Sequence, residues 1–301
     1  MARRLSTPDW RLCTAVLRGV ARSGGRHRVP CPLCERTRGK SDTKESLYLH
    51  ADGGFVCFRC GAAGFMPGAT PRQYTAPQAS TTAAVWQRPP DGFTLLYDGE
   101  GMLDPRFGPH RTYLETESPK GRGLDPNVAR FSYVGGILRP RPAVVVPVLD
   151  PTGKYWQGWV ARDLHPTAGW SPYRYPQGMP WHTYLYGQDI LGEASSFPAF
   201  VVEGVFDRMA LYPHGVATLG KPTGNHIAIL ARSKRPVVFC PDGDAWGPAE
   251  WHAYTLRLVG VRSGAIRLPP RVDPDEVLRD DVFDYGLLSL DQQDAVRLGA
   301  G

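Results

Sequence analysis

Residues 200–207 read FVVEGVFD, and residues 236–244 read PVVFCPDGD. In both segments a short apolar run ends directly in carboxylates. Runs of this kind are typical of strands that are buried on both faces of a parallel sheet. Helix-like segments separate them, so we predict a parallel sheet with right-handed crossovers. Its strands are expected at 200–202, 215–219, 236–240 and 265–268, and its helices at 205–212, 224–233 and 247–259.

Acidic residues follow three of these predicted strands. They are Glu203 and Asp207 after the first strand, Asp242 and Asp244 after the third, and Asp273, Asp275 and Glu276 after the fourth. The carboxyl ends of parallel strands lie along one edge of a sheet, so these side chains are expected to converge. Converging carboxylates repel one another unless cations neutralise them, and Mg²⁺ or Mn²⁺ prefer oxygen ligands. We therefore predict one or two cations that promote phosphoryl transfer; solvated loop acids or helix caps are the alternative.

A second candidate metal site lies nearer the N-terminus. Cys31 and Cys34 form one Cys-x-x-Cys pair, Cys57 and Cys60 form another, and 22 residues separate the pairs. Zn²⁺ binds four thiolates tetrahedrally, and paired cysteines at this spacing are typical of such a site. Four protein ligands leave no open position, so we expect one structural zinc ion rather than a catalytic one.

A hairpin is expected to join the two cysteine pairs. Strands are predicted at 47–50 and 55–58, with an Asp-Gly turn between them. Two disulfides or unrelated buried cysteines are the alternatives to zinc, and His27 and His50 are possible substitute ligands. Cys240 lies in an apolar run and is expected in the core.

The positive charge is concentrated at the N-terminal end. Residues 1–60 hold 12 basic and five acidic side chains, whereas the whole chain holds 35 and 29. A basic module of this kind predicts contact with a polyanion, most simply a nucleic acid. Arginine outnumbers lysine 29 to 6, which suits bidentate phosphate contacts but also follows from a GC-rich genome.

The composition also predicts how the chain is divided. Residues 66–92 are rich in Pro, Ala, Thr and Ser without apolar periodicity, which is typical of a flexible linker. The expected segments are 1–65 for a zinc-ribbon template-binding domain, 66–92 for the linker, 93–195 for the first part of the core, 196–285 for the parallel-sheet part and 286–301 for a short C-terminal helix or tail.

Composition excludes several classes of protein. The 301 residues are 42% hydrophobic and 11% aromatic, which excludes a wholly disordered chain and a coiled coil. No window approaches the roughly 18 consecutive apolar residues of a transmembrane helix, and no signal peptide is visible. Six cysteines are too few for a disulfide scaffold. We expect a cytoplasmic protein without a membrane partner.

The acidic motifs resemble those of a known domain. The pattern EG-x-x-D at 203–207, followed by D-x-D at 242–244, resembles the Toprim domain of bacterial-type primases, topoisomerases and recombination mediators. DPDE at 273–276 more specifically resembles bacterial-type replicative DNA primases. The fold class implied is α/β (α+β overall): an N-terminal zinc ribbon, then a mixed α+β subdomain and a Toprim parallel-sheet α/β subdomain.

Three further stretches resemble the polymerase core of those primases. They are RGL at 122–124 with NVARFSYVG at 127–135, AVVVPVLDPTGKYWQGWVARDL at 143–164, and LYG at 185–187. With the cysteine module in front, the resemblance covers roughly residues 25–280 in the family's order.

The sequence departs from the family's pattern in three places. The bacterial ribbon usually has a histidine among its zinc ligands. In this chain Cys34 replaces that histidine, as a cysteine does in some phage primase–helicases. The segment at 181–184, which reads WHTY, lacks the family's lysine before LYG. Only 25 residues follow Glu276, so we expect the helicase-docking domain to be absent. These features resemble a primase of a phage or another mobile element.

The resemblance implies that the chain synthesises RNA primers. A primase joins nucleoside triphosphates on a single-stranded DNA template, and its replicative helicase would be a separate chain. Metal binding is implied for Asp242, Asp244 and Asp273, and metal binding or proton transfer for Glu203. Asp207 would support the catalytic site, and Asp275 would lie close by. Arg122 and Arg162 would hold template or nucleotide phosphates. Lys221 is a further candidate of our own, which an exposed loop lysine would explain equally well.

Proteins of other classes share parts of this pattern. A recombination mediator also combines a four-cysteine zinc element with a Toprim domain, but it does not account for 111–187 or 273–276. A topoisomerase needs a nucleophilic tyrosine in a further domain. A Toprim nuclease would use the same acids. A non-catalytic accessory protein that binds single-stranded DNA remains a further alternative.

Overall fold

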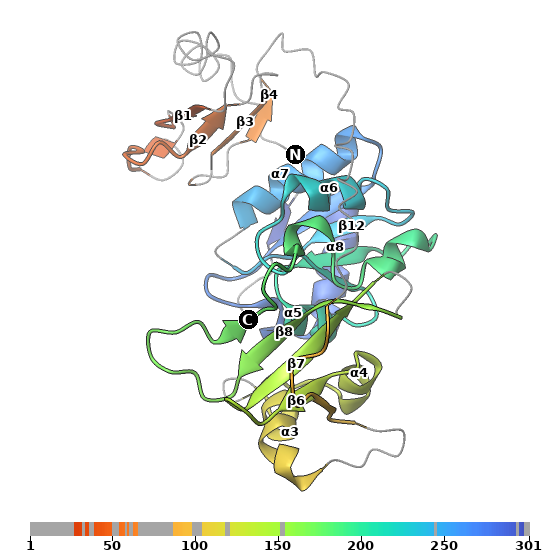
Figure 1. Cartoon of the computed structure of the whole chain (residues 1–301). Coiled ribbons are helices and arrows are strands. Elements are labelled where there is room, and N and C mark those ends of the chain that lie inside the picture. Colours follow the sequence, from red (N-terminus) through yellow and green to blue (C-terminus); the bar gives the residue numbers. More distant parts are fainter. Residues whose placement is uncertain are drawn as a thin grey trace.

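The computed structural model describes most of the chain. The described residues are 27–31, 34–35, 39–49, 54–57, 59, 63–65, 87–97, 104–117, 121–150, 154–243, 246–292 and 295–297. Within them the strands form three sheets (Figure 1). Most of the linker predicted at 66–92, Cys60 and Asp244 lie outside these residues. So does the segment 7–21, in which apolar residues at helical spacing predict a helix.

The first sheet carries the cysteines. Its strands β1 (His27–Val29), β2 (Leu47–Leu49), β3 (Gly54–Cys57) and β4 (Ala63–Phe65) lie in chain order and are all antiparallel. The β2–β3 hairpin is the one predicted from the sequence. Its register places Leu47 opposite Cys57, and both residues are buried.

The second sheet is also antiparallel. It contains β5 (Thr94–Leu95), β6 (Gly135–Ile137), β7 (Ala143–Leu149), β8 (Trp156–Asp163) and β9 (Tyr173–Arg174) in that order. Pro147 lies within β7, which is the central strand of this sheet. Strand β6 pairs with β7 only from Ala143 to Val145, so Pro147 lies beyond that pairing. On the other side Pro147 pairs with Trp159 of β8, and the register shifts only after Val148. A proline cannot donate to the ladder, and it is tolerated where a strand has no paired neighbour on one side.

The third sheet is parallel. Its strand order is β11 (Gly215–Ala217), β10 (Ala199–Val202), β12 (Val237–Phe239), β13 (Ser263–Arg267) and β14 (Ala295–Arg297). All adjacent pairs are parallel, which confirms the fold class. Four of the strands were predicted, whereas β14 was not.

Helices connect these elements. Those of the antiparallel part are η2 (Pro105–Phe107), α3 (Gly108–Glu115) and α4 (Pro126–Phe131), followed by the short η3 (Trp181–Thr183) and η4 (Gln188–Gly192). The parallel part has α5 (Val205–Ala210), α6 (Gly224–Leu230), α7 (Trp246–Leu258), η5 (Pro274–Glu276) and α8 (Arg279–Gln292). No helix within the described residues is both long and apolar enough to cross a membrane.

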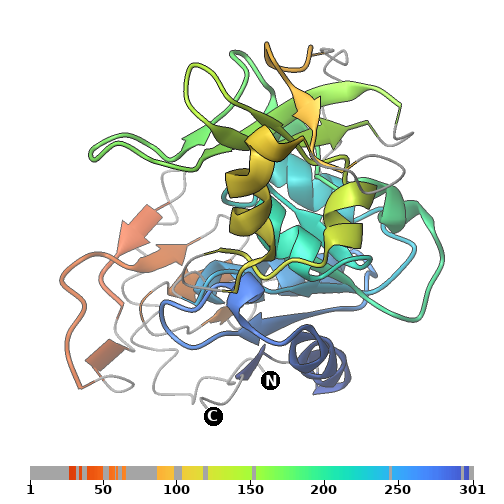
Figure 2. The same ribbon diagram turned by 90° about the horizontal axis from the view of Figure 1, so that it is seen from below.

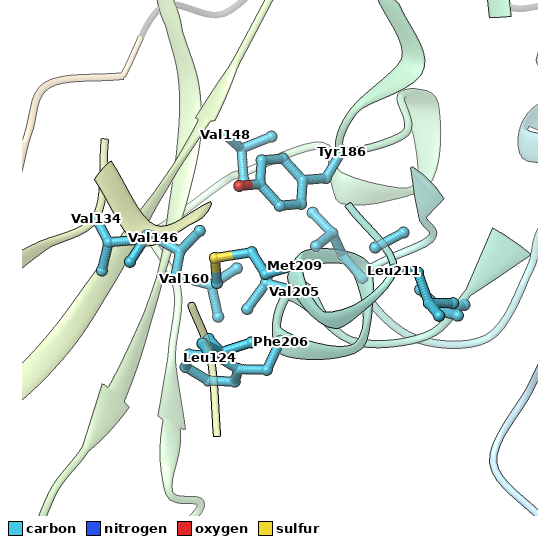
Figure 3. Close-up of a cluster of buried hydrophobic side chains, with 14 of the residues drawn as sticks. Leu124, Val134, Val146, Val148, Val160, Tyr186, Val205, Phe206, Met209 and Leu211 are labelled. Carbon is cyan, nitrogen blue, oxygen red and sulfur yellow. The ribbon is translucent and has the colours of Figure 1, made fainter. Parts of the chain in front are cut away.

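One hydrophobic core joins the second and third sheets. Helix α5 lies between them (Figures 1 and 2), and Phe206 and Met209 pack with Val146 and Val160 of the antiparallel sheet (Figure 3). The same cluster includes Phe200 of β10 and Cys240, which follows β12. This confirms the prediction that Cys240 lies in the core. Burying this shared apolar surface holds the two sheets in one unit.

The other face of the parallel sheet has its own core. Val201 and Phe239 point into a second cluster with Ile227 of α6 and Leu256 of α7. Successive strand residues alternate between the two clusters, so each strand is covered on both faces. This explains why the apolar runs in the sequence lack polar alternation.

Candidate active site and zinc site

Four of the predicted acidic residues line one cavity. It measures about 270 Å³, and its lining includes Glu203, Asp207, Asp242 and Asp273. The first two follow β10, the third follows β12 and the fourth follows β13, which are neighbouring strands of the parallel sheet. The structure therefore brings these four side chains together.

A glycine fixes the position of Asp207. The backbone amide of Gly204 donates to Oδ2 of Asp207 at 3.0 Å, which closes the first turn of α5. A Cβ on Gly204 would collide with that carboxylate. The EG-x-x-D pattern thus has a local reason, because the glycine lets the carboxylate fold back onto its own loop.

A second glycine joins the loops after β12 and β13. The amide of Gly243 donates to the carbonyl of Val272 at 3.0 Å. A Cβ on Gly243 would overlap the carbonyl of Pro269, so the two loops pack too closely for any other residue. This contact holds Asp242 near Asp273, which follows Val272 directly.

Asp275 forms a buried ion pair with Arg122. The Nη1 atom of Arg122 lies 2.6 Å from Oδ2 of Asp275, whose side chain is 3% exposed. Arg122 also donates to the hydroxyls of Tyr113 at 2.8 Å and Tyr173 at 3.3 Å, and it lies 4.8 Å from the ring centroid of Phe206. The other oxygen, Oδ1, is buried without a hydrogen-bond partner among the described residues. An oxygen left in this state fits a cation-binding region.

The three basic residues predicted to hold phosphates occupy different positions. Arg122 lines the cavity, although its guanidinium already carries the hydrogen bonds above. Arg162 is half-buried, donates to Tyr113 at 3.2 Å and lies 4.9 Å from the ring centroid of Tyr173. Lys221 is exposed and follows Gly220, which lines the cavity.

The electrostatics of the cavity are those of a crowded carboxylate cluster. Burial, and then the charges of Asp275, Asp242 and Asp273, raises the pKa of Asp207 to about 8. Arg122 opposes this shift without cancelling it. A divalent cation would neutralise the same repulsion, so the donor set fits Mg²⁺ or Mn²⁺.

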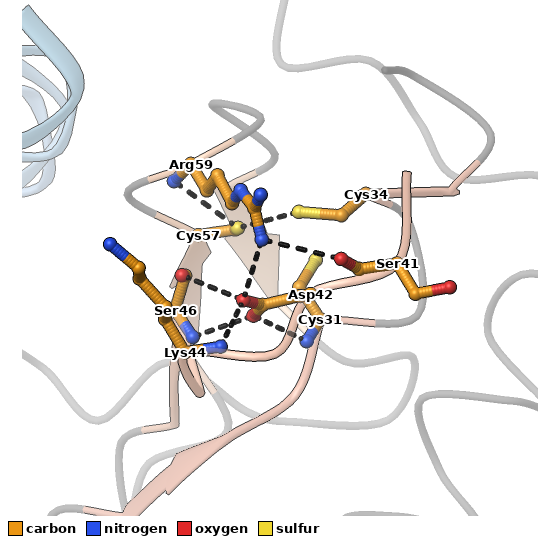
Figure 4. A network of polar contacts seen from close by, with 8 residues as sticks. All are labelled: Cys31, Cys34, Ser41, Asp42, Lys44, Ser46, Cys57 and Arg59. Carbon is orange, nitrogen blue, oxygen red and sulfur yellow. Dashed lines mark hydrogen bonds and ion pairs between the residues drawn. The ribbon is translucent and has the colours of Figure 1, made fainter. Parts of the chain in front are cut away.

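The cysteine cluster is the second candidate metal site. The sulfur atoms of Cys31, Cys34 and Cys57 all lie within 4.8 Å of one another, and the three residues are buried. The Cys34 and Cys57 sulfurs are 3.7 Å apart (Figure 4). A disulfide would need about 2.05 Å, whereas two thiolates on one tetrahedral Zn²⁺, with Zn–S of about 2.3 Å, lie about 3.8 Å apart. The donor set therefore fits a structural zinc ion.

Asp42 is a residue that sequence reasoning missed. Its buried carboxylate accepts hydrogen bonds from the amides of Cys31 at 2.9 Å, Lys44 at 2.9 Å and Ser46 at 2.6 Å, and from the Ser46 hydroxyl at 2.9 Å (Figure 4). Arg59, whose amide donates to the Cys57 sulfur, lies 3.4 Å from the same carboxylate. Burial alone would raise the pKa of Asp42, but these donors hold it well below its usual range. Asp42 thus ties the Cys31 knuckle to the loop before β2.

Two aromatic residues of the cavity were also missed. Tyr173 and Tyr175 line it together with the acids. Residues 165–182 are dense in Pro, Gly and aromatic residues, which predicts an ordered irregular loop. The sequence contains no signal for which of these aromatic residues would reach the site. That depends on the pairing of β9 with β8, which the sequence did not predict.

The fold and the cavity together define a class of protein. Carboxylates gathered at the carboxyl edge of a parallel sheet, beside arginine, are the arrangement of a metal-dependent phosphoryl-transfer site. A cysteine cluster suited to zinc precedes it in the chain.

Comparisons with known proteins narrow this class. The DNA primase of Legionella pneumophila is 43% identical over 121 residues, which cover 36% of this chain and 21% of that protein. The Aquifex aeolicus DNA primase is 25% identical over 216 residues, or 55% of this chain and 42% of that protein. A crystal structure of the Aquifex aeolicus primase, with its zinc-binding and RNA polymerase domains, covers 96% of this chain and 86% of that one at 18% identity and a TM-score of 0.47. No model of a known family matches the chain.

Part of the chain is therefore similar to bacterial DNA primases, as its motifs predict. It spans about a fifth to two fifths of the length of these curated relatives.

Proposed function

We propose that this chain is a DNA primase, which synthesises short RNA primers on a single-stranded DNA template from nucleoside triphosphates. The observation that carries the proposal is the convergence of Glu203, Asp207, Asp242 and Asp273 in one cavity with Arg122. The similarity to bacterial DNA primases supports it. The replicative helicase would be a separate chain. We also keep as predictions the domain division given above and an origin in a phage or another mobile element.

The reaction is the attack of a 3′-hydroxyl on an α-phosphate, with pyrophosphate as the leaving group. Glu203, Asp242, Asp244 and Asp273 would hold one or two Mg²⁺ or Mn²⁺ ions, which neutralise the charge that develops on the phosphate. Asp207 would hold the loop of Glu203 through its hydrogen bond to Gly204.

The basic residues would act on the substrate's phosphates. Arg122, fixed by Asp275 and by two tyrosine hydroxyls, is preorganised for this role because its guanidinium has little freedom to lose. Arg162 and Lys221 would contact phosphates further from the acids. Cys31, Cys34, Cys57 and Cys60 would hold the structural zinc, and the module they fold would bind the template.

A primer-synthesis assay tests the proposal. The chain is mixed with single-stranded DNA of mixed sequence, labelled nucleoside triphosphates and Mg²⁺ or Mn²⁺. Asp242→Asn is expected to reduce synthesis about 10³-fold or more, because metal ligands contribute several kcal/mol to such reactions. Asp91→Asn, at an exposed residue, is the matched control and should retain full activity.

Other outcomes would contradict the proposal. Template degradation that Asp242→Asn abolishes would indicate a nuclease instead. Retained DNA binding with neither synthesis nor degradation would indicate an accessory protein.

A further inference from the structure

We propose that Tyr175 stacks against the base of the nucleoside triphosphate in the acidic cavity, an inference that rests on the proposed function. The cavity has two chemically different linings. One consists of carboxylates, and the other includes the rings of Tyr173 and Tyr175. A nucleotide has the same two parts, since its phosphates seek the cations and its base offers a flat apolar face.

The two tyrosines differ in how far their rings are available to contact a ligand. Tyr173 accepts a hydrogen bond from Arg122 at 3.3 Å, and Arg162 lies over its ring at 4.9 Å. Tyr175 is 46% exposed, and within the described residues its ring and hydroxyl have no hydrogen bond or aromatic contact. Its face is therefore open to a ligand, whereas Tyr173 is held in place by arginines.

The backbone that carries Tyr175 is anchored from its other side. Strand β9 ends at Arg174, and the tyrosines on either side of Arg174 line the cavity whereas Arg174 does not. Its Nε donates at 2.7 Å to Asp163, a fully buried carboxylate that lies 3.1 Å from Arg141 as well. The position of Tyr175 is thus fixed by an ion-paired network before any ligand enters, which lowers the entropic cost of stacking.

The occupant we infer is the substrate nucleotide rather than the template. Tyr175 lines the same cavity as Glu203, Asp242 and Asp273, so a ligand whose phosphates are held there brings its own base to the ring. Stacking on an aromatic face tolerates every base, because each base has a π-face. A template-directed polymerase needs this tolerance in its nucleotide site, since base pairing makes the selection.

Steady-state kinetics of three variants test this inference. Tyr175→Leu is expected to raise the KM for nucleoside triphosphates about tenfold, as the loss of one base–aromatic stack predicts. The KM for template and the kcat should change less than twofold. Tyr175→Phe should restore the low KM because it keeps the ring. Phe131→Leu changes an exposed aromatic residue of α4 that does not line the cavity, and it should behave as wild type.

A binding measurement separates this inference from the proposed function. The fluorescence of 2-aminopurine riboside triphosphate with Mg²⁺ should be quenched by the wild-type protein and by Tyr175→Phe, but not by Tyr175→Leu. Inorganic tripolyphosphate with Mg²⁺ should bind all three equally. Quenching that depends on Tyr175 in a protein without primer synthesis would support the stack and overturn the primase. An unchanged nucleotide KM in Tyr175→Leu, or an increase in the template KM alone, would overturn the stack.

Discussion

The two candidate metal sites are built in different ways. The cysteine cluster uses residues close together in the chain. Its sulfurs lie within 4.8 Å of one another, and they come from β3 and from the segment between β1 and β2 of one small antiparallel sheet. The acidic cavity collects side chains from three strands that are up to 70 residues apart, between Glu203 and Asp273. Short-range motifs create the first site, whereas the order of strands in a parallel sheet creates the second.

This difference predicts how far the folding of each site depends on its bound metal. A small sheet whose strands have only three or four residues depends on its ligands, because binding of structural zinc is itself folding free energy. The acidic cavity is held by two large hydrophobic clusters and by Arg122, so it forms without a cation but under electrostatic strain. The predictions below test this contrast, beginning with the largest expected effect.

Loss of one thiolate should abolish the first site. Cys57→Ser is expected to lose bound zinc and the fold of the first sheet, since zinc binding contributes about 10–16 kcal/mol in comparable peptides. Metal analysis by mass spectrometry and protection of the β2–β3 amides from hydrogen exchange would measure this. Cys240→Ala, at the buried cysteine of the core, is the control and should keep one zinc per chain. Retained zinc in Cys57→Ser would contradict the assignment.

A single methyl group should damage the second site without removing a carboxylate. Gly243→Ala forces apart the loops of Asp242 and Asp273, because its Cβ overlaps the carbonyl of Pro269. A misplacement of about 1 Å in a catalytic group costs about 10²-fold in rate, which primer-synthesis kinetics would detect.

Gly192→Ala provides the control for this variant. A Cβ at Gly192 meets nothing within 4 Å, so activity should stay at the wild-type level. Wild-type activity in Gly243→Ala would show that the close packing of the two loops is irrelevant to catalysis.

Asp42 should stabilise the first sheet through its hydrogen bonds, although it is not one of the proposed zinc ligands. Asp42→Asn removes the charge that accepts four hydrogen bonds, so unfolding of the first sheet should become easier by about 2 kcal/mol. Its lowered pKa gives the sign of the pH effect: the contribution is complete above the unfolded value of 3.8 and is lost as the pH falls below it. Hydrogen exchange in urea at pH 7 measures the difference.

The control for Asp42 is a neighbouring acid. Glu35→Gln changes an exposed carboxylate seven residues away and should leave the exchange rates unaltered. Equal effects of the two substitutions would show that general charge, rather than the hydrogen bonds of Asp42, stabilises the sheet.

The sequence predicts the strands of the parallel sheet well because burial on both faces leaves an unbroken apolar run. It also predicts that Glu203, Asp242 and Asp273 meet, since this follows from strand direction alone. It does not predict β14, a three-residue strand without such a run. The roles of Asp42 and Tyr175 are also hidden, because each depends on tertiary pairing: one on a loop that folds against Cys31, the other on the Asp163–Arg174 ion pair.

The strain in the acidic cavity should be visible in the pH dependence of stability. Burial and the neighbouring carboxylates raise the pKa of Asp207 to about 8 from an unfolded value of 3.8. Between these values the folded protein without divalent cations holds a proton that the unfolded chain has released. Its stability therefore falls as the pH rises, by at most about 1.4 kcal/mol per pH unit, and levels off above pH 8.

Mg²⁺ and the substitution Asp207→Asn should each remove this dependence of stability on pH. The cation replaces the proton as the neutralising charge, so with 10 mM Mg²⁺ as a working concentration the midpoint of urea unfolding should change little from pH 6 to pH 8. Asp207→Asn should give the same flat profile without Mg²⁺, whereas Asp284→Asn, at an acid of α8 outside the cavity, should keep the wild-type slope. An unaltered slope in Asp207→Asn would place the titration elsewhere. The acidic cavity would then be no more strained than the cysteine cluster, and the contrast between the two sites would fail.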